Sequence, residues 1–232
     1  MKRLDLILNG KGGVGKSFFA VNFVQYLKDK NLTHAALDSD NENSTLKRFH
    51  PDASFIDLAD RRGLDEVFNV LEKSSLVVMD CRAASTDLFL DFFETIDVAA
   101  VLSGMGAALT LIMPVNHETD SVDQVQRMAD GLGSKCNYVI VRNAAHSDRF
   151  EMYEGSEVRE LITKQLGGLE ITMSQLPDWL VIALQQQNVT ITKAVTHPAF
   201  SLLDRQRLQT WQRKLYAGIE AASGLLLPTH EK

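Results

Sequence analysis

Eight consecutive residues near the amino terminus match the phosphate-loop pattern GxxxxGK[ST] in full. They are Gly10, Lys11, Gly12, Gly13, Val14, Gly15, Lys16 and Ser17. Glycines allow the N–H groups of such a loop to point at phosphate oxygens, and a helix that opens at Lys16 adds the positive end of its dipole. Lys16 would neutralise the β and γ phosphates of a nucleotide, and Ser17 would place its hydroxyl on Mg²⁺. We therefore expect a nucleotide site that reaches Phe18, and the alternative is a glycine-rich turn without a ligand.

Three aspartates end apolar runs at positions where a metal ion would lie. Asp38 and Asp40 end the segment 35–40, and Asp80 ends the segment 76–80. The carboxyl ends of parallel strands converge on the ligand crevice, and a spacing of two on a continuing strand would place the first pair on one face. An apolar strand that ends in aspartate has the Walker B form, in which the carboxylate holds Mg²⁺ through water. The alternative for the first pair is a surface turn rich in Asp and Asn.

The second lysine of the loop, Lys11, is not needed to hold phosphate within one subunit. With it, the stretch KGGVGKS resembles the deviant Walker A motif of the ParA/MinD family of P-loop ATPases. In that family the equivalent lysine reaches across a nucleotide-sandwich dimer to the partner's phosphates. The resemblance therefore implies that Lys11 acts in trans in an ATP-dependent homodimer. The alternative is a solvated loop lysine.

The same resemblance assigns roles to the aspartates. It implies that Asp40 orients the attacking water, so that Asp40 joins Lys11 and Lys16 in the catalytic set, and that Asp38 lies near the Mg²⁺ shell. The magnesium ligands would then be Ser17, Asp38 and Asp80. The family usually follows its Walker B aspartate with a Pro or Gly turn, whereas this chain continues with residues 81–85 of sequence CRAAS. The conformation of that loop is therefore not predicted.

Two positions would flank the base. Asn143 ends the run 139–143, where the family's Asn or Arg contacts adenine, and Pro177 stands in a turn that resembles the family's turn beside the base. A plain turn proline is the alternative for Pro177. The chain has no NKxD guanine signature, which favours ATP over GTP. The stretch 38–46 and the short length look more like plasmid stability or conjugal-transfer ATPases of the TraL/StbB kind.

Short apolar runs alternate with longer amphipathic segments, which is the pattern of a mostly parallel, twisted sheet with helices on both faces. The expected strands are Leu4–Leu8, Ala35–Asp38, Leu76–Asp80, Ala108–Pro114, Tyr138–Arg142 and Leu169–Met173, with Phe55–Leu58 as a further candidate. The expected helices are Lys16–Lys30, Gly63–Glu72, Ser85–Thr95, Glu118–Leu132, Gly155–Leu166, Trp179–Gln187 and Phe200–Ala222. The fold class is therefore α/β, with a single P-loop domain over 1–227 and a short disordered tail over 228–232.

Composition limits the partners and the compartment. The chain of 232 residues has a formal net charge of −6, so the molecule as a whole is not an electrostatic nucleic-acid binder. Its two cysteines stand far apart without CxxC spacing, which indicates the cytoplasm. The uncharged stretch 98–115 is interrupted by Ser and Gly, so we expect a helix end, a turn and a buried strand there, and no membrane span.

The last predicted helix carries four basic residues beside its apolar stripe. They are Arg205, Arg207, Arg213 and Lys214. Against Asp204 they leave a local charge of +3, which would form a patch for the DNA backbone or for anionic lipid. The alternative is a helix that simply covers the sheet.

The resemblance implies an ATPase that works as a switch: ATP binding makes the dimer, hydrolysis releases it, and a protein partner stimulates hydrolysis. Its setting would be DNA or plasmid partition, transfer or cellular positioning. The competing class is a metabolic P-loop ligase or kinase that passes phosphoryl to a small molecule. A third class is a binding module that retains nucleotide without turnover.

Overall fold

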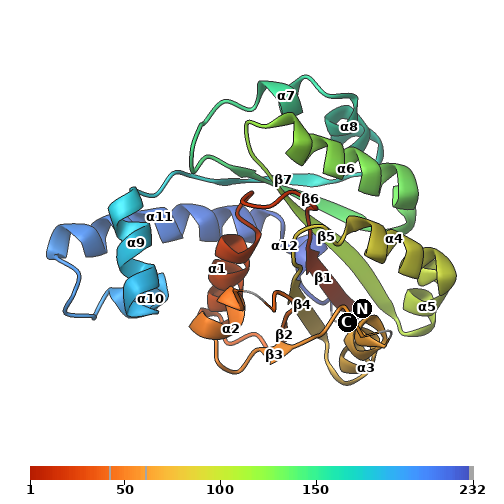
Figure 1. The fold of residues 1–232 in the computed structure, drawn as a ribbon, viewed down its shortest axis with the longest axis horizontal. Coiled ribbons are helices and arrows are strands. Elements are labelled where there is room, and N and C mark those ends of the chain that lie inside the picture. The colour runs from red at the N-terminus through yellow and green to blue at the C-terminus, as the bar shows by residue number, and fades with distance from the viewer. Residues whose placement is uncertain (42, 61, 230–232) are drawn as a thin grey trace.

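The computed structural model of the chain describes residues 1–41, 43–60 and 62–229. Seven strands form one parallel sheet in the order β3-β2-β4-β1-β5-β6-β7 (Figure 1). Their bounds are β1 Lys2–Ile7, β2 Ala35–Asp38, β3 Ser54–Phe55, β4 Leu76–Asp80, β5 Ala107–Val115, β6 Asn137–Asn143 and β7 Leu169–Met173. The predicted α/β fold with a parallel sheet is confirmed.

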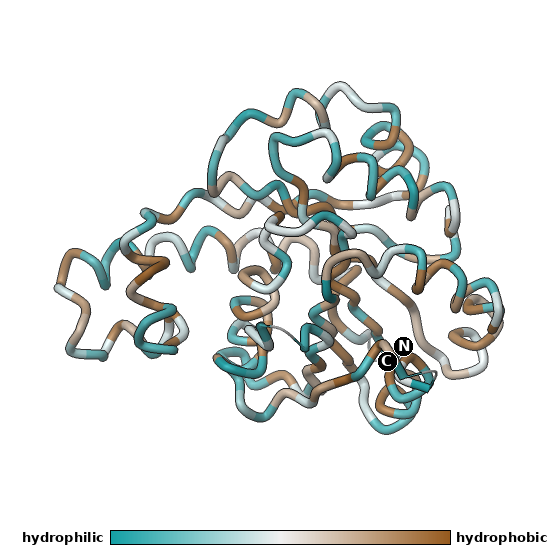
Figure 2. Tube along the Cα trace, viewed as in Figure 1, coloured by the Kyte–Doolittle hydropathy of each residue, from teal (hydrophilic) through white to brown (hydrophobic). Residues whose placement is uncertain are grey.

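Helices cover both faces of the sheet (Figure 1). One face packs against α3 Gly63–Lys73, α4 Thr86–Thr95, α5 Val98–Gly104, α6 Thr119–Leu132, α7 Glu151–Glu154 and α8 Glu157–Glu160. The other packs against α1 Lys16–Asp29, α2 Thr45–Phe49, α9 Asp178–Gln187, α10 Ile191–Ala194, α11 Leu202–Ala221 and α12 Ser223–Leu226. Figure 2 shows apolar residues along the central strands and alternating with polar ones along the helices, as helical amphipathicity requires.

The carboxyl ends of β1, β2 and β4 lie level with one another. Ile7 of β1 is in register with Asp80 of β4 and with Ile112 of β5. Asp38 of β2 is in register with Asp80 as well. The loops that follow β1, β2 and β4 therefore leave the sheet at one edge, which is where ligands bind in open α/β sheets.

Several short elements differ from the sequence expectation. The helix expected over Gly155–Leu166 is a short α8 that continues as a π-helix over Leu161–Gln165. The strand candidate Phe55–Leu58 is only the two-residue β3, and α2, α7, α10 and α12 were not predicted. Each of these four helices has four or five residues, so each is too short to show a hydrophobic period in the sequence.

The uncharged stretch 98–115 has the predicted arrangement. Helix α5 ends at Gly104, Gly106 adopts a left-handed φ of 60°, and β5 begins at Ala107. Across the described ranges, the structure has no helix that is both long enough and apolar enough to cross a membrane.

The carboxyl-terminal segment is attached to the start of β1. The Thr229 N–H donates to the Met1 carbonyl over 3.2 Å, and the Met1 amino group donates back to the Thr229 carbonyl. The tail predicted over 228–232 lies outside the described residues from 230 onward. Its disorder stays a prediction.

A buried polar cluster anchors α12 to the sheet. Arg3 donates to the carbonyls of Gly224 over 2.7 Å and Leu227 over 3.2 Å, and the Thr110 hydroxyl donates to Leu225 over 2.6 Å. Asp5 is fully buried close to Arg3 and Thr110. Its carboxylate oxygens accept no hydrogen bond of ordinary geometry from any described residue. Burial therefore raises the pKa of Asp5 well above its ordinary value, although the Arg3 charge opposes the shift.

Replacing Asp5 with Asn is expected to stabilise the protein above neutral pH and to flatten its pH dependence. In the unfolded chain Asp5 ionises near pH 4, whereas in the folded chain it keeps its proton to higher pH, so stability falls as pH rises through that window. Asn removes the ionisation, and we expect a gain of about 1–3 kcal/mol at pH 8. Urea unfolding at pH 5 and pH 8 tests this, and equal stability of both proteins at pH 8 would contradict it.

Candidate nucleotide site

The loop from Asn9 to Lys16 has the shape of a phosphate nest. Gly13 and Gly15 adopt left-handed φ values of 75° and 95°. A Cβ at Gly15 would lie 2.4 Å from Nδ2 of Asn143, so the backbone approach at this position requires glycine. Such a succession of left-handed and right-handed residues turns N–H groups toward one point, where an anion fits.

A buried asparagine that the sequence did not single out holds the loop in place. The Asn9 amide donates to the carbonyls of Pro114 over 2.8 Å and Ser121 over 2.9 Å, and its oxygen accepts the Lys11 N–H over 2.9 Å. These bonds attach the loop to β5 and α6. The Asn9-Gly10 pair looks in sequence like an ordinary turn, so its only signal was polarity directly after an apolar strand.

Lys16 is buried at the start of α1, with its ammonium group directed at the loop. Its Nζ donates to the Lys11 carbonyl over 2.9 Å, and the side chain is 7% exposed. Burial lowers the pKa of Lys16, while the charges of Asp80 and Asp40 oppose that shift. A desolvated ammonium group beside a nest of N–H groups is suited to bind phosphate oxygens.

Asp80 fits the ligand set of a hydrated Mg²⁺ ion. It is 1% exposed, and neither carboxylate oxygen accepts a hydrogen bond of ordinary geometry from the described residues. Burial raises the pKa of Asp80 to about 7, the Ser17 hydroxyl lies near enough to lower it, and the Asp38 charge raises it further. An orphaned carboxylate beside a serine hydroxyl and a second carboxylate is the oxygen environment that Mg²⁺ prefers. Ser17 and Asp80 would hold the ion, with Asp38 behind them.

The structure corrects the geometry expected for Asp38 and Asp40. Strand β2 ends at Asp38, so the two residues do not alternate on a continuing strand. Instead Oδ1 of Asp38 accepts the Asp40 N–H over 3.0 Å, and Oδ2 accepts the Lys47 N–H of α2 over 3.0 Å. Asp40 begins a turn, as the alternative of a surface turn rich in Asp and Asn had it. The Asp40 carboxylate accepts the backbone N–H of Asn43 over 3.2 Å and the side-chain amide of Asn43 over 3.3 Å. Both aspartates nevertheless lie at the carboxyl edge, and their charges act on Asp80.

The loop after Asp80, whose conformation the sequence left open, is tied to the phosphate loop. The Ala84 N–H donates to the Gly10 carbonyl over 2.9 Å, and the Arg82 N–H donates to the Ser39 hydroxyl over 3.0 Å. Ala84 has a left-handed φ of 54°, which is unfavourable for a residue with a Cβ. The chain thus uses a strained alanine in place of the family's Pro or Gly turn.

A cavity of ≈ 280 Å³ beside the loop could hold the base. Phe18, Asn143, Leu176 and Asp178 line it. The Asn143 amide donates to the Val14 carbonyl over 2.9 Å, and its oxygen accepts the Ala145 N–H over 3.1 Å. The second amide hydrogen of Asn143 remains for a base edge. The predicted contact with the base stays a prediction, in which Asn143 would donate that hydrogen.

Pro177 lies beside this cavity but does not line it. Its neighbours Leu176 and Asp178 face the base cavity, whereas Pro177 lines a groove on the side of α11. The turn borders this cavity through Leu176 and Asp178, and a base contact at Pro177 stays a prediction. Pro177 itself sets the start of α9, since its carbonyl accepts the Leu180 N–H over 2.9 Å.

Lys11 is held by two acidic residues of its own subunit. Its Nζ lies 3.0 Å from Oδ2 of Asp120 and 3.3 Å from Oε2 of Glu118, at the start of α6. Asp120 and then Glu118 raise the pKa of Lys11 and keep it charged. Sequence reasoning missed both acids, because only the packing of α6 beside the loop brings them to Lys11.

The four basic residues of α11 do not form one patch. Arg207 and Lys214 are seven residues apart and share a side of the helix, whereas Arg205 and Arg213 point to other sides. Arg205 donates to the His197 carbonyl over 3.0 Å, and Arg213 donates to the Thr210 hydroxyl over 3.2 Å. The four residues therefore do not share one side of the helix, and the expected contact with a DNA backbone stays a prediction.

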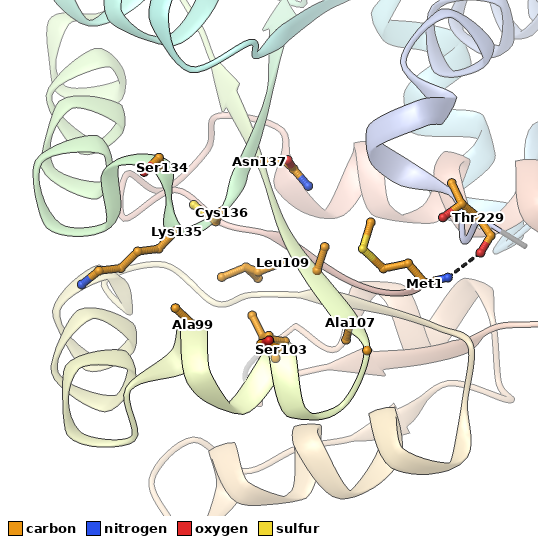
Figure 3. Close-up of a pocket in the computed structure, with 13 residues that line it drawn as sticks. Met1, Ala99, Ser103, Ala107, Leu109, Ser134, Lys135, Cys136, Asn137 and Thr229 are labelled. Atoms are coloured by element: carbon orange, nitrogen blue, oxygen red, sulfur yellow. Dashed lines mark hydrogen bonds between the residues drawn. The ribbon is translucent and has the colours of Figure 1, made fainter. Parts of the chain in front are cut away.

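A larger cavity lies away from this chemistry. Its volume is ≈ 850 Å³, and it surrounds the start of β5 at the opposite edge of the sheet, with Met1, Leu109, Lys135 and Cys136 on its walls (Figure 3). Strand β5 begins at Ala107, whereas its pairing with β6 begins only at Thr110. No residue of the phosphate loop and no aspartate lines it, so volume alone does not identify the site.

Comparisons with known proteins agree with this geometry. The profile of the CobQ/CobB/MinD/ParA nucleotide binding domain matches residues 6–216. Protein MobD of Acidithiobacillus ferrooxidans is 23% identical over 92% of this chain and 94% of its own length. Protein TraL of Escherichia coli is 24% identical over 97% of this chain and 100% of its own length.

Solved structures share the fold. The septum site-determining protein MinD of Pyrococcus horikoshii, in complex with Mg-ADP, gives a TM-score of 0.57 at 17% identity and covers 99% of this chain and 100% of its own. A putative plasmid partition protein of Borrelia burgdorferi bound to AMPPNP gives 0.54 at 15% identity, over 95% of this chain and 99% of its own. With a complete phosphate loop, a Walker B aspartate at the same edge and a matching profile over most of its length, the chain belongs to the CobQ/CobB/MinD/ParA nucleotide binding domain family, as a ParA/MinD-type P-loop protein similar to TraL.

Proposed function

We propose that the protein is an ATP-dependent switch that dimerises with ATP and Mg²⁺ bound and separates after hydrolysis. The observation that carries this proposal is Lys11, a charged residue inside the phosphate loop that binds acids of α6 rather than facing its own nest. A lysine in that position is available to a second subunit once its acidic partners release it. The names of the relatives, MobD, TraL and a plasmid partition protein, favour a setting in plasmid transfer or partition.

Residues of one subunit account for binding. Lys16 and the N–H groups of the nest would hold the phosphates, and Phe18 and Asn143 would contact the base. Ser17 and Asp80 would hold Mg²⁺, which when bound neutralises charge between phosphate oxygens. Asp40, where the turn after β2 begins, would orient water toward the γ phosphate.

Residues of two subunits would account for the switch. Lys11 must leave Asp120 and Glu118 to reach a partner's phosphates, so dimerisation exchanges two exposed ion pairs for contacts with a more charged and less solvated group. A protein partner that changes the position of α6 would then alter the rate of hydrolysis. Gel filtration with and without a slowly hydrolysed ATP analogue and Mg²⁺ tests the proposal, and a monomer under both conditions would contradict it.

Replacing Lys16 with Ala is expected to lower ATP affinity by about a hundredfold. The change removes a charge-assisted contact in a partly desolvated loop, which is worth roughly 2–3 kcal/mol. Calorimetry with ATP and Mg²⁺ measures the effect, with Lys73→Ala on the exposed surface of α3 as the matched control. Unchanged affinity in Lys16→Ala would remove the phosphate loop from the site.

A further inference from the structure

A groove of ≈ 380 Å³ runs between α11 and the segment 174–177. We call it the α11 groove, and it is defined by Leu176, Pro177, Leu203, Arg207, Trp211 and Lys214. The segment 174–177 separates the groove from the base cavity, since Ser174 and Leu176 line both the groove and that cavity. No residue of the phosphate loop lines the groove, so it is a separate surface.

The charge of the groove is opposite to that of the whole chain. Arg207 and Lys214 line it one above the other on α11, no carboxylate lines it, and the chain has a net charge of −6. Asp204 takes one hydrogen bond from Arg207 over 3.2 Å, which leaves the other guanidinium N–H groups for a ligand. An acidic group is therefore the complementary occupant.

The floor of the groove is apolar. Trp211 is 5% exposed and Leu176 is also buried, whereas Leu203 at the rim is 64% exposed. Pro177 completes this surface. An aliphatic or aromatic side chain of a ligand could cover Leu203 and pack on Trp211 and Pro177. The backbone of a DNA duplex would meet only two basic residues at this surface, too few for strong binding. A peptide with acidic and apolar side chains uses both features of the groove.

The groove is connected to the base cavity by direct contacts. The Trp211 indole N–H donates to the Ser174 carbonyl over 2.6 Å, and the Trp211 ring packs edge-to-face on Phe18 with centroids 5.5 Å apart. Phe18 and Ser174 both line the base cavity. A ligand that moves Trp211 therefore moves two walls of the nucleotide site.

We propose that the α11 groove docks an acidic peptide segment of a protein partner, with one apolar side chain as its anchor, and that Trp211 couples this docking to the nucleotide site. The coupling rests on the proposed function, because it presumes that nucleotide occupies the base cavity. The docking itself does not, since it requires only the groove.

The test uses Trp211 as its own reporter. The chain has two tryptophans, and the other, Trp179, is 60% exposed, so Trp179→Phe isolates the Trp211 signal. The full chain is titrated with a pool of short synthetic peptides in which Leu or Phe is flanked by Asp and Glu. A second pool with Lys and Arg in place of the acids and a short DNA duplex are titrated in parallel. We expect saturable change of Trp211 fluorescence with the acidic pool alone.

Charge reversal locates the binding. The double variant Arg207→Glu with Lys214→Glu is expected to weaken binding of the acidic pool by about tenfold or more, while Arg213→Glu, on another side of the same helix, leaves it unchanged. Arg207→Gln with Lys214→Gln should show a smaller loss and covers the case in which the reversal fails to fold. No saturable binding of the acidic pool, an equal loss in Arg213→Glu, or DNA binding that needs Arg207 and Lys214 would overturn the proposal.

Nucleotide measurements separate this inference from the proposed function. We expect the acidic pool to bind Lys16→Ala as it binds the wild type, because Lys16 does not line the groove. We also expect the pool to change ATP affinity or hydrolysis in the wild type and not in the double reversal variant. Docking without either effect would overturn the coupling through Trp211, whereas absence of ATP binding in the wild type would overturn the proposed function and leave the docking result intact.

Discussion

Replacing Lys11 with Ala is expected to leave ATP binding by the monomer nearly intact and to abolish both ATP-dependent dimerisation and hydrolysis. The Lys11 ammonium group binds Asp120 and Glu118 of its own subunit, so its loss removes no contact within the nest. Only its backbone carbonyl supports Lys16, over 2.9 Å, and alanine keeps that carbonyl. The side chain matters only where a second subunit supplies the phosphates, and there a missing cation costs about a thousandfold or more in hydrolysis.

Calorimetry measures ATP binding by the monomer, and gel filtration with a slowly hydrolysed ATP analogue measures dimerisation. The matched variant is Glu118→Gln with Asp120→Asn, which keeps Lys11 but removes the charges that hold it. It should dimerise at lower analogue concentration than the wild type. If Lys11→Ala binds ATP far more weakly as a monomer, the lysine acts within its own subunit and the dimer assignment is wrong.

The sequence predicted those parts of the site that depend on local geometry. A glycine-rich loop between a strand and a helix can adopt few conformations, so the nest and Lys16 lie where the pattern requires. Asp80 was equally predictable, because an apolar run that ends in aspartate within a parallel sheet must end at the ligand edge. The central strands followed for the same reason: β4 is buried throughout, and β5 and β6 consist mostly of buried residues.

The parts that depend on how elements pack could not be predicted. Asn9 reaches two carbonyls more than a hundred residues away, and Lys11 meets acids at a similar distance along the chain. Period-two reasoning failed for Asp38 and Asp40, because the Asp38 carboxylate accepts the Asp40 N–H and so ends the strand. The sequence places four basic residues close together in α11, whereas the helix turns them to different sides.

Replacing Asp40 with Ala is expected to leave ATP binding intact and to lower hydrolysis by roughly a hundredfold or more, the usual size of a lost general-base contribution. Lys16 keeps its contact with the Lys11 carbonyl, and the hydrogen bonds described for the Asp40 carboxylate come from Asn43 rather than from Lys16, Ser17 or Asp80. The ATP-bound dimer should then accumulate. Since the Asp40 carboxylate also accepts two hydrogen bonds from Asn43, the variant alters the turn as well as the chemistry.

Asn43→Ala separates these two effects. It removes the amide that donates to Asp40 over 3.3 Å but leaves the carboxylate and the backbone N–H in place. If Asp40 acts on water, Asn43→Ala should hydrolyse ATP at close to the wild-type rate while Asp40→Ala does not. Phosphate release under saturating ATP measures both rates, and calorimetry shows whether each variant still binds. Wild-type hydrolysis in Asp40→Ala would leave Asp40 only its structural role in the turn, and equal losses in both variants would assign the effect to the turn rather than to the carboxylate.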